Sequence, residues 1–152
     1  MQNAIELQDA IPQEHPLGCA VACVAYRRGV SYEDAHSLFV TPENAWGRGY
    51  YCAEVVAALN KKSRLEYVFS KADVLKKSEL KKILLTEGTL VFVGSCSRYP
   101  LGHYLVRATE KAKHRAQWMN PWINAPRMIP VQSGFESKLP GPVEYVMWEP
   151  VL

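Results

Sequence analysis

The spacing of apolar residues changes near Thr89, and this change limits the possible folds more than any other feature of the sequence. Before it, apolar residues recur at helical spacing over 18–28, 31–39 and 53–60. After it, they come in short or alternating runs separated by turn-forming residues, which is typical of strands. Helices followed by strands predict an α+β domain, with N-terminal helices packed on a C-terminal antiparallel sheet and a cleft between them.

The expected helix ends carry signals of their own. Gly29 is expected to end the first helix as its C-cap, and Ser31 with Asp34 resembles a capping box for the second. Residues 41–50 are rich in turn formers and predict a loop. A Lys-rich helix follows, with a serine cap and three apolar members: Ser70 or Ser78 as the cap, and Leu80, Ile83 and Leu84.

Six segments are expected to form strands, because they carry β-branched and aromatic residues between turn formers. These segments are 65–69, 89–94, 103–108, 115–120, 127–131 and 144–148. No repeat, low-complexity stretch or linker interrupts the chain. With 152 residues, of which 48% are hydrophobic, the sequence predicts a single domain over 1–152 that needs no metal or disulfide to build its core.

Charge and hydropathy limit the class of partner. The net charge is +3, and the basic residues are scattered, which argues against a nucleic-acid-binding protein. The lysines at 76, 77, 81 and 82 are interpreted as the solvated face of one helix. No apolar run approaches the roughly 20 residues of a membrane helix, so membrane insertion is not expected. Residues 1–12 lack a secretory signal pattern, so reduced cysteines and a cytoplasmic location are expected.

A cysteine at the start of the first helix is the strongest candidate for chemistry. Cys19 opens this helix, and Gln13 lies six positions earlier in Q-E-H-P-L-G-C. Unpaired N–H groups and the helix macrodipole favour an anion at such a position, so the Cys19 thiol is expected to ionise near neutral pH. The side-chain amide of Gln13 can donate a hydrogen bond to an oxyanion.

A base and an orienting group follow downstream. His103 begins an apolar run in G-H-Y-L-V, and Asn120 lies in W-M-N-P-W. A thiolate needs a base that takes and returns its proton, and the base needs a third group that fixes its ring and tautomer. Cys19, His103 and Asn120 can supply these three functions. The two tryptophans beside Asn120 would shield its hydrogen bond from water, although Asn120 could also be a simple turn residue before proline.

The remaining cysteines and histidines have simpler interpretations. His15 precedes the first helix and would be a poor base for Cys19. Cys19 and Cys23 lie on one helical face, but no second short-spaced Cys/His pair completes a tetrahedral site, so neither a metal nor another cofactor is expected. Packing, loop or surface positions are expected for Cys23, Cys52, Cys96, His36 and His114.

Three short motifs occur in a fixed order between residues 13 and 148. The first is Q-x-x-x-x-x-C-x-x-A-C, present as Q-E-H-P-L-G-C-A-V-A-C. The second is G-H-Y-L-V at the start of a strand, and the third is Asp or Asn before proline, present as Asn120-Pro121. In these motifs the chain resembles the papain-like peptidases that remove double-glycine leader peptides from bacteriocin and related precursors, usually at the N-terminus of ABC exporters.

This resemblance implies a papain-like cysteine peptidase fold and an acyl-enzyme thioester. Cys19 would be the nucleophile, His103 the base and Asn120 its orienting group, while Gln13 and the Cys19 N–H would stabilise the oxyanion. The implied substrate is a polypeptide precursor cleaved after a small pair such as Gly-Gly. Exporter-linked members generally carry Asp in place of Asn120, but a neutral side chain can still accept the imidazole N–H.

Two other functions stay open at this stage. One is a catalytically weak, peptidase-like module that binds a leader or a transported polypeptide, and the other is an acyl transferase that hands the thioester to an amine. No transmembrane segment or ATP-binding motif follows the motifs, so the domain is expected to stand alone, with an exporter or membrane-bound partner left open. Trp46, Tyr50 and residues 97–102 are the expected walls of the cleft.

Overall fold

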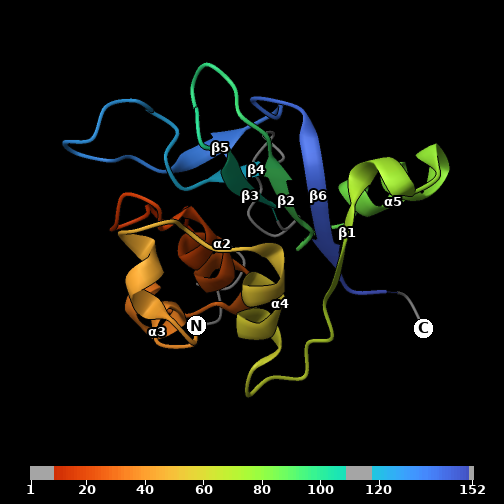
Figure 1. Ribbon diagram of the computed structural model, residues 1–152, viewed down its shortest axis with the longest axis horizontal. Coiled ribbons are helices and arrows are strands. Elements are labelled where there is room, and N and C mark those ends of the chain that lie inside the picture. The colour runs from red at the N-terminus through yellow and green to blue at the C-terminus, as the bar shows by residue number, and fades with distance from the viewer. Residues whose placement is uncertain (1–8, 109–117, 151–152) are drawn as a thin grey trace.

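Helices and strands separate along the chain much as the apolar spacing predicts. The computed structural model describes residues 9–108 and 118–150, and Figure 1 shows their arrangement. Its helices are α2 (Cys19–Arg28), α3 (Tyr32–His36), α4 (Cys52–Asn60) and α5 (Lys77–Leu85), with 3-10 helices η1 (Pro42–Ala45) and η2 (Ala72–Val74). Its strands are β1 (Val68–Lys71), β2 (Leu90–Val93), β3 (His103–Arg107), β4 (Trp118–Asn120), β5 (Gly134–Glu136) and β6 (Val143–Trp148).

The strands form one six-stranded sheet in the order β1-β6-β2-β3-β4-β5. Every neighbouring pair is antiparallel, which confirms the predicted α+β class with an antiparallel sheet. Strand β6 inserts between β1 and β2, whereas β2 to β5 follow one another in chain order. Loops 94–102 and 121–133, which connect neighbouring strands, extend from the same side of the molecule (Figure 1).

Both faces of the sheet are covered by helices. Figure 1 shows α2, α3 and α4 together on one side and α5 on the other, beside β1 and β6. Along β2, Leu90 and Phe92 pack with the α2–α4 side, while Val91 and Val93 pack with the α5 side. This double coverage explains why β2 is a continuous apolar run and does not alternate with polar residues.

Helix α2 lies at the centre of the helical layer and carries the candidate nucleophile at its first position. All residues from Ala20 to Tyr26 are buried, and the helix contacts α3, α4 and β3. Its alanines allow neighbouring elements to approach closely. Gly29 ends it with φ = 69°, in the left-handed region that glycine adopts without steric cost, as the sequence predicts.

Two of the predicted helix ends need correction. The Ser31 Oγ accepts from the Asp34 N–H at 3.0 Å, as expected, but α3 ends at His36 and does not reach residue 39. Helix α5 is capped by neither predicted serine, because Ser70 lies in β1 and Ser78 lies inside the helix. Instead, the Glu79 carboxylate accepts from the Lys76 N–H at 3.4 Å.

The lysines of α5 are exposed, as predicted, and its apolar side packs on the sheet. Among the predicted strands, 127–131 is wrong: it belongs to the loop before β5, and the prolines that flank or interrupt it have no N–H for a strand ladder. The strand expected over 65–69 begins at Val68, because Tyr67 pairs its backbone with the Asn60 side chain at 2.8 and 3.1 Å. Residues 115–117 of another predicted strand lie outside the described residues.

Candidate active site

Cys19 lies at the first position of α2, where the chain enters the helix through a tight turn. Gly18 is the N-cap, and a Cβ at this position would collide with the Tyr32 hydroxyl. That hydroxyl is fixed by a 2.8 Å hydrogen bond with His15 Nδ1. Glycine before the cysteine is therefore a packing requirement of the turn that places Cys19.

A cleft of about 320 Å³ connects the start of α2 with the start of β3. Cys19 and His103 both line it, so the fold brings these two predicted residues to one site. In the described residues no hydrogen bond joins the Cys19 thiol to the His103 ring. Among the residues that the structure describes, the lining is Gln13, Pro16, Leu17, Cys19, Tyr99, Pro100, Leu101, Gly102, His103 and Trp122.

The expectation that Cys19 ionises near neutral pH is wrong for the free protein. Burial of the sulfur raises the pKa of the Cys19 thiol to about 11. Nearby backbone N–H groups, first that of Tyr104 and then that of Ala20, lower this pKa but by less than burial raises it. The helix start does supply N–H groups to the sulfur, but desolvation dominates, and the resting thiol is neutral at pH 7.

His103 is almost completely buried at the first position of β3. Its Nε2 lies 2.7 Å from Asn120 Oδ1, and the Tyr99 ring stacks on the imidazole with centroids 3.8 Å apart. Burial lowers the pKa of His103 to about 4, and the hydrogen bond to Asn120 opposes this shift only in part. The resting imidazole is therefore also neutral at pH 7.

The turn before His103 requires glycine. Gly102 has φ = 82°, in the left-handed region, and a Cβ there would collide with the Phe92 ring. Val93 then pairs with His103 at the end of the β2–β3 hairpin. The position of the imidazole thus follows from backbone geometry on both sides of it.

Asn120 is fully buried at the end of β4, and all four of its side-chain hydrogen-bonding positions are occupied. Its Oδ1 accepts from the Trp122 N–H at 2.9 Å as well as facing His103. Its Nδ2 donates to the Tyr99 hydroxyl at 2.9 Å and to the Glu136 carboxylate. Because Oδ1 can only accept, His103 carries its proton on Nε2, and Nδ1 is left as the basic nitrogen.

Gln13 lines the cleft, but its amide does not offer a free donor. Its Nε2 donates to the carbonyl oxygens of His15 at 3.1 Å and Pro16 at 3.0 Å, which uses both amide protons. Its buried Oε1 has no hydrogen-bond partner. In this conformation neither amide proton of Gln13 is available to an oxyanion. The amide would have to reorient to serve as the predicted oxyanion donor.

The predicted walls of the cleft are correct only in part. Tyr99 to Gly102 line it, but Trp46 does not and instead lies against the His15 ring, with centroids 4.0 Å apart. Tyr50 is buried and donates its hydroxyl proton to the Pro42 carbonyl at 2.8 Å. The sequence argument also missed the roles of Tyr99 and Glu136 around Asn120, since neither lies at a spacing that points to His103 or Asn120.

The other cysteines and histidines take up separate positions. All four cysteines are free thiols, with Cys23 and Cys52 buried and Cys96 partly exposed. His36 Nε2 bonds to the Pro42 carbonyl at 2.8 Å, and His114 lies outside the described residues. Within residues 9–108 and 118–150, no three His, Cys, Asp or Glu side chains gather as metal ligands, and no helix is long and apolar enough to span a bilayer.

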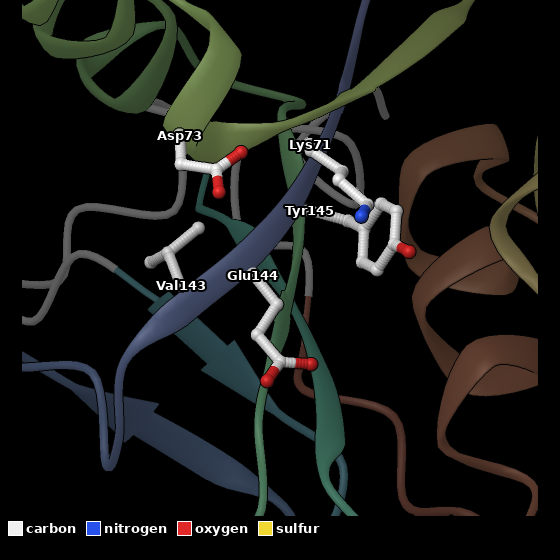
Figure 2. Close-up of a pocket in the computed structure, with 5 residues that line it drawn as sticks. All are labelled: Lys71, Asp73, Val143, Glu144 and Tyr145. Carbon is white, nitrogen blue, oxygen red and sulfur yellow. The ribbon is translucent and has the colours of Figure 1, made fainter.

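A second cleft, of about 300 Å³, lies beside β1 and β6. Figure 2 shows its lining, with the Asp73 and Glu144 carboxylates apart from each other and Lys71 beside the Tyr145 ring. Its charged side chains are exposed to solvent, and no cysteine or histidine is among its described lining residues. We therefore locate the candidate active site in the Cys19–His103 cleft.

Comparison of the chain with family models, with curated proteins and with solved structures gives no match in any of the three.

Proposed function

We propose that this chain is a cysteine peptidase with a papain-like fold, related to the double-glycine leader peptidases. The observation that carries the proposal is the shared cleft of Cys19 and His103, with Asn120 holding His103 so that the basic Nδ1 remains for the thiol. The chain order of Cys19, His103 and Asn120 supports it further only because it agrees with the resemblance to these peptidases.

The proposed reaction begins from the neutral thiol and imidazole. His103 Nδ1 takes the thiol proton as Cys19 sulfur bonds to the carbonyl carbon of the scissile peptide, and the carbonyl oxygen becomes an oxyanion. The oxyanion then collapses, the C–N bond breaks, and His103 returns the proton to the leaving amine. Water then attacks the resulting thioester while His103 Nδ1 takes a proton from it. The C–S bond breaks, His103 returns the proton to the Cys19 sulfur, and the acid is released.

The shifted pKa values oppose proton transfer from Cys19 to His103 in the resting site. With a thiol pKa of about 11 and an imidazole pKa of about 4, the separated ions are disfavoured in the resting site. Substrate binding must therefore supply part of the stabilisation, through the Cys19 N–H and a reoriented Gln13 amide at the oxyanion. A reducing compartment such as the cytoplasm suits this chemistry, since the nucleophile must stay a thiol.

The proposed substrate is a polypeptide with a pair of small residues, such as Gly-Gly, at the cleavage point. Bulky side chains of Leu17, Tyr99 and Trp122 line the cleft, which supports a preference for small residues beside the thiol.

A second candidate function is a peptidase-like module that binds a polypeptide without cleaving it. Two observations favour it. The pKa of the Cys19 thiol is raised, and the two amide protons of Gln13 are both donated to backbone carbonyls. An acyl transferase would share the thioester but pass it to an amine.

One experiment separates these functions. A peptide with a Gly-Gly junction and a matched peptide with Val-Val at the junction are incubated with the protein and with the Cys19→Ala variant, and products are weighed by mass spectrometry. We expect cleavage after Gly-Gly and a transient acyl adduct on Cys19. Binding without cleavage would favour the module, and a product joined to an added amine would favour the transferase.

A further inference from the structure

The amide of Asn120 can take only one orientation in its surroundings. The Trp122 N–H can only donate, and it lies 2.9 Å from Oδ1. The Glu136 carboxylate can only accept, and it faces Nδ2. Turning the amide over would place its oxygen against the Glu136 carboxylate and its N–H against the Trp122 N–H, so both of these hydrogen bonds would be lost.

The partners of Glu136 fix its position in turn. Arg98 Nη1 lies 3.2 Å from Glu136 Oε1, so the carboxylate has a cationic partner. Arg98 also donates to the Ile123 carbonyl at 2.7 Å and to the Tyr99 hydroxyl at 3.2 Å. The carboxylate is therefore held between Arg98 and Asn120, with only 19% of its side chain exposed.

We propose that Glu136 is a positioning residue of this site, and that it requires an amide at position 120. Its carboxylate accepts a hydrogen bond from Asn120 Nδ2, so Oδ1 points to His103 and the proton of the imidazole stays on Nε2. An aspartate at position 120 would place a second carboxylate against Glu136. The proposal rests on the proposed function for its effect on turnover, but its effect on position 120 can be measured without activity.

The test exchanges the amide and the carboxylate between positions 120 and 136. In Asn120→Asp, two carboxyl groups face each other, and the pair keeps a proton well above the pH at which a free carboxyl loses it. In the double variant Asn120→Asp with Glu136→Gln, the new amide donates to the new carboxylate, and the hydrogen bond is restored in reverse. The nearby groups that also bear on this pair are Arg98, Tyr99 and His103.

Stability gives the first readout, which does not depend on catalysis. The folded Asn120→Asp protein binds more protons than the unfolded chain, so its stability falls as the pH rises. We expect the Tm of Asn120→Asp, relative to that of the double variant at the same pH, to fall by about 5 °C or more between pH 4.5 and 7.5. Equal pH dependence in the two variants would overturn the proposal.

Turnover gives the second readout. We expect kcat for the Gly-Gly peptide at pH 8 to be about ten- to a hundredfold lower in Asn120→Asp than in the double variant, with similar KM. Equal kcat values would overturn the proposal. If even the parent protein cleaves nothing, the proposed function fails, but the comparison of Tm values still decides the role of Glu136.

A pair of single variants keeps the test decisive if Asp at position 120 prevents folding in both backgrounds. Glu136→Gln can turn its carbonyl oxygen to Asn120, whereas Glu136→Met fills a similar volume without an acceptor. We expect Gln to stay within about threefold of the parent kcat and Met to lose about tenfold at unchanged KM. Parent-like kcat in Glu136→Met would show that Asn120 needs no partner at position 136.

Discussion

The two halves of the candidate site differ in how far they are prepared for chemistry. Around Asn120, every hydrogen-bonding position is filled, and the His103 ring is stacked on Tyr99 and held in one tautomer. Around Cys19, the thiol is neutral, and both amide protons of Gln13 are bound to backbone carbonyls. In the proposed mechanism, the base is thus fixed in advance, whereas the nucleophile and the oxyanion donor would be set by the substrate.

The largest expected effect concerns the nucleophile. Cys19→Ala should lower kcat for the Gly-Gly peptide by about four powers of ten or more, because no other thiol lines the described cleft. Cys23→Ala is the matched control, since Cys23 is buried on the same helix and should affect only packing. Equal loss of activity in two folded variants would remove Cys19 from the mechanism.

Alkylation tests whether the Cys19 thiol is neutral in the free protein. With a pKa of about 11, only a small fraction of Cys19 is thiolate at pH 7. In a Cys96→Ala background, the rate of reaction with iodoacetamide should rise by about tenfold per pH unit between pH 7 and 9. A rate that is already level above pH 7 would show an activated thiolate and would erase the contrast between the two halves.

Gln13 gives the next largest effect. If its amide reorients toward the oxyanion, Gln13→Ala should lower kcat by about a hundredfold to a thousandfold, with a much smaller change in KM. Gln13→Met, which keeps the length of the side chain but has no donor, should lose as much. A change confined to KM would mean that the amide keeps its bonds to His15 and Pro16 during the reaction.

The buried base should appear in the pH dependence of stability. The folded-state pKa of His103, about 4, lies below its ordinary value of 6.5, so the unfolded chain binds more protons between these values. Stability should therefore fall as the pH decreases from 6.5 to 4, by on the order of 3 kcal/mol in the free energy of unfolding. His103→Gln should remove this part of the pH dependence in denaturant titrations; an unchanged slope would show that His103 is not buried in its neutral form.

The smallest expected effect comes from the Tyr99 hydroxyl, which lies beside Asn120. Tyr99→Phe keeps the ring against His103 but removes the acceptor for Asn120 Nδ2 and the donor to the Trp122 carbonyl. The loss of these hydrogen bonds, at a site where Glu136 and the Trp122 N–H still hold Asn120, should lower kcat by about tenfold. Ser95→Ala, at an exposed position of the same loop that does not line the cleft, serves as the control and should leave kcat within about twofold in the same assay.

Much of the fold could be predicted from the sequence because local signals agreed with the final packing. The spacing of apolar residues located α2 and most of the sheet, and Gly29 marked the end of α2. The exceptions arose where a side chain competed with a local pattern. Asn60 takes the backbone groups of Tyr67 that an earlier start of β1 would need, and Glu79 replaces the expected serine cap of α5.

The candidate site was predictable to a smaller extent. Residue type and order were enough to predict that His103 and Asn120 form a pair, although their catalytic roles stay predictions. The pKa of Cys19 was not predictable, because desolvation depends on packing that a helix-start argument ignores. Glu136 was not predictable either, since it reaches Asn120 only through the pairing of β4 with β5, in which Glu136 lies opposite Trp118.

The ties between loops 94–102 and 121–133 bear on how specificity could be altered. Tyr99 donates to the Trp122 carbonyl at 2.6 Å, and Arg98 donates to the Ile123 carbonyl at 2.7 Å. Because both acceptors are backbone atoms, the bonds depend on the path of the second loop and not on its side chains. The two loops therefore support each other, and a change in the path of either loop would break both bonds. Variants aimed at new substrates should therefore keep Arg98 and Tyr99, whose side chains make both bonds, and should keep the length of the second loop.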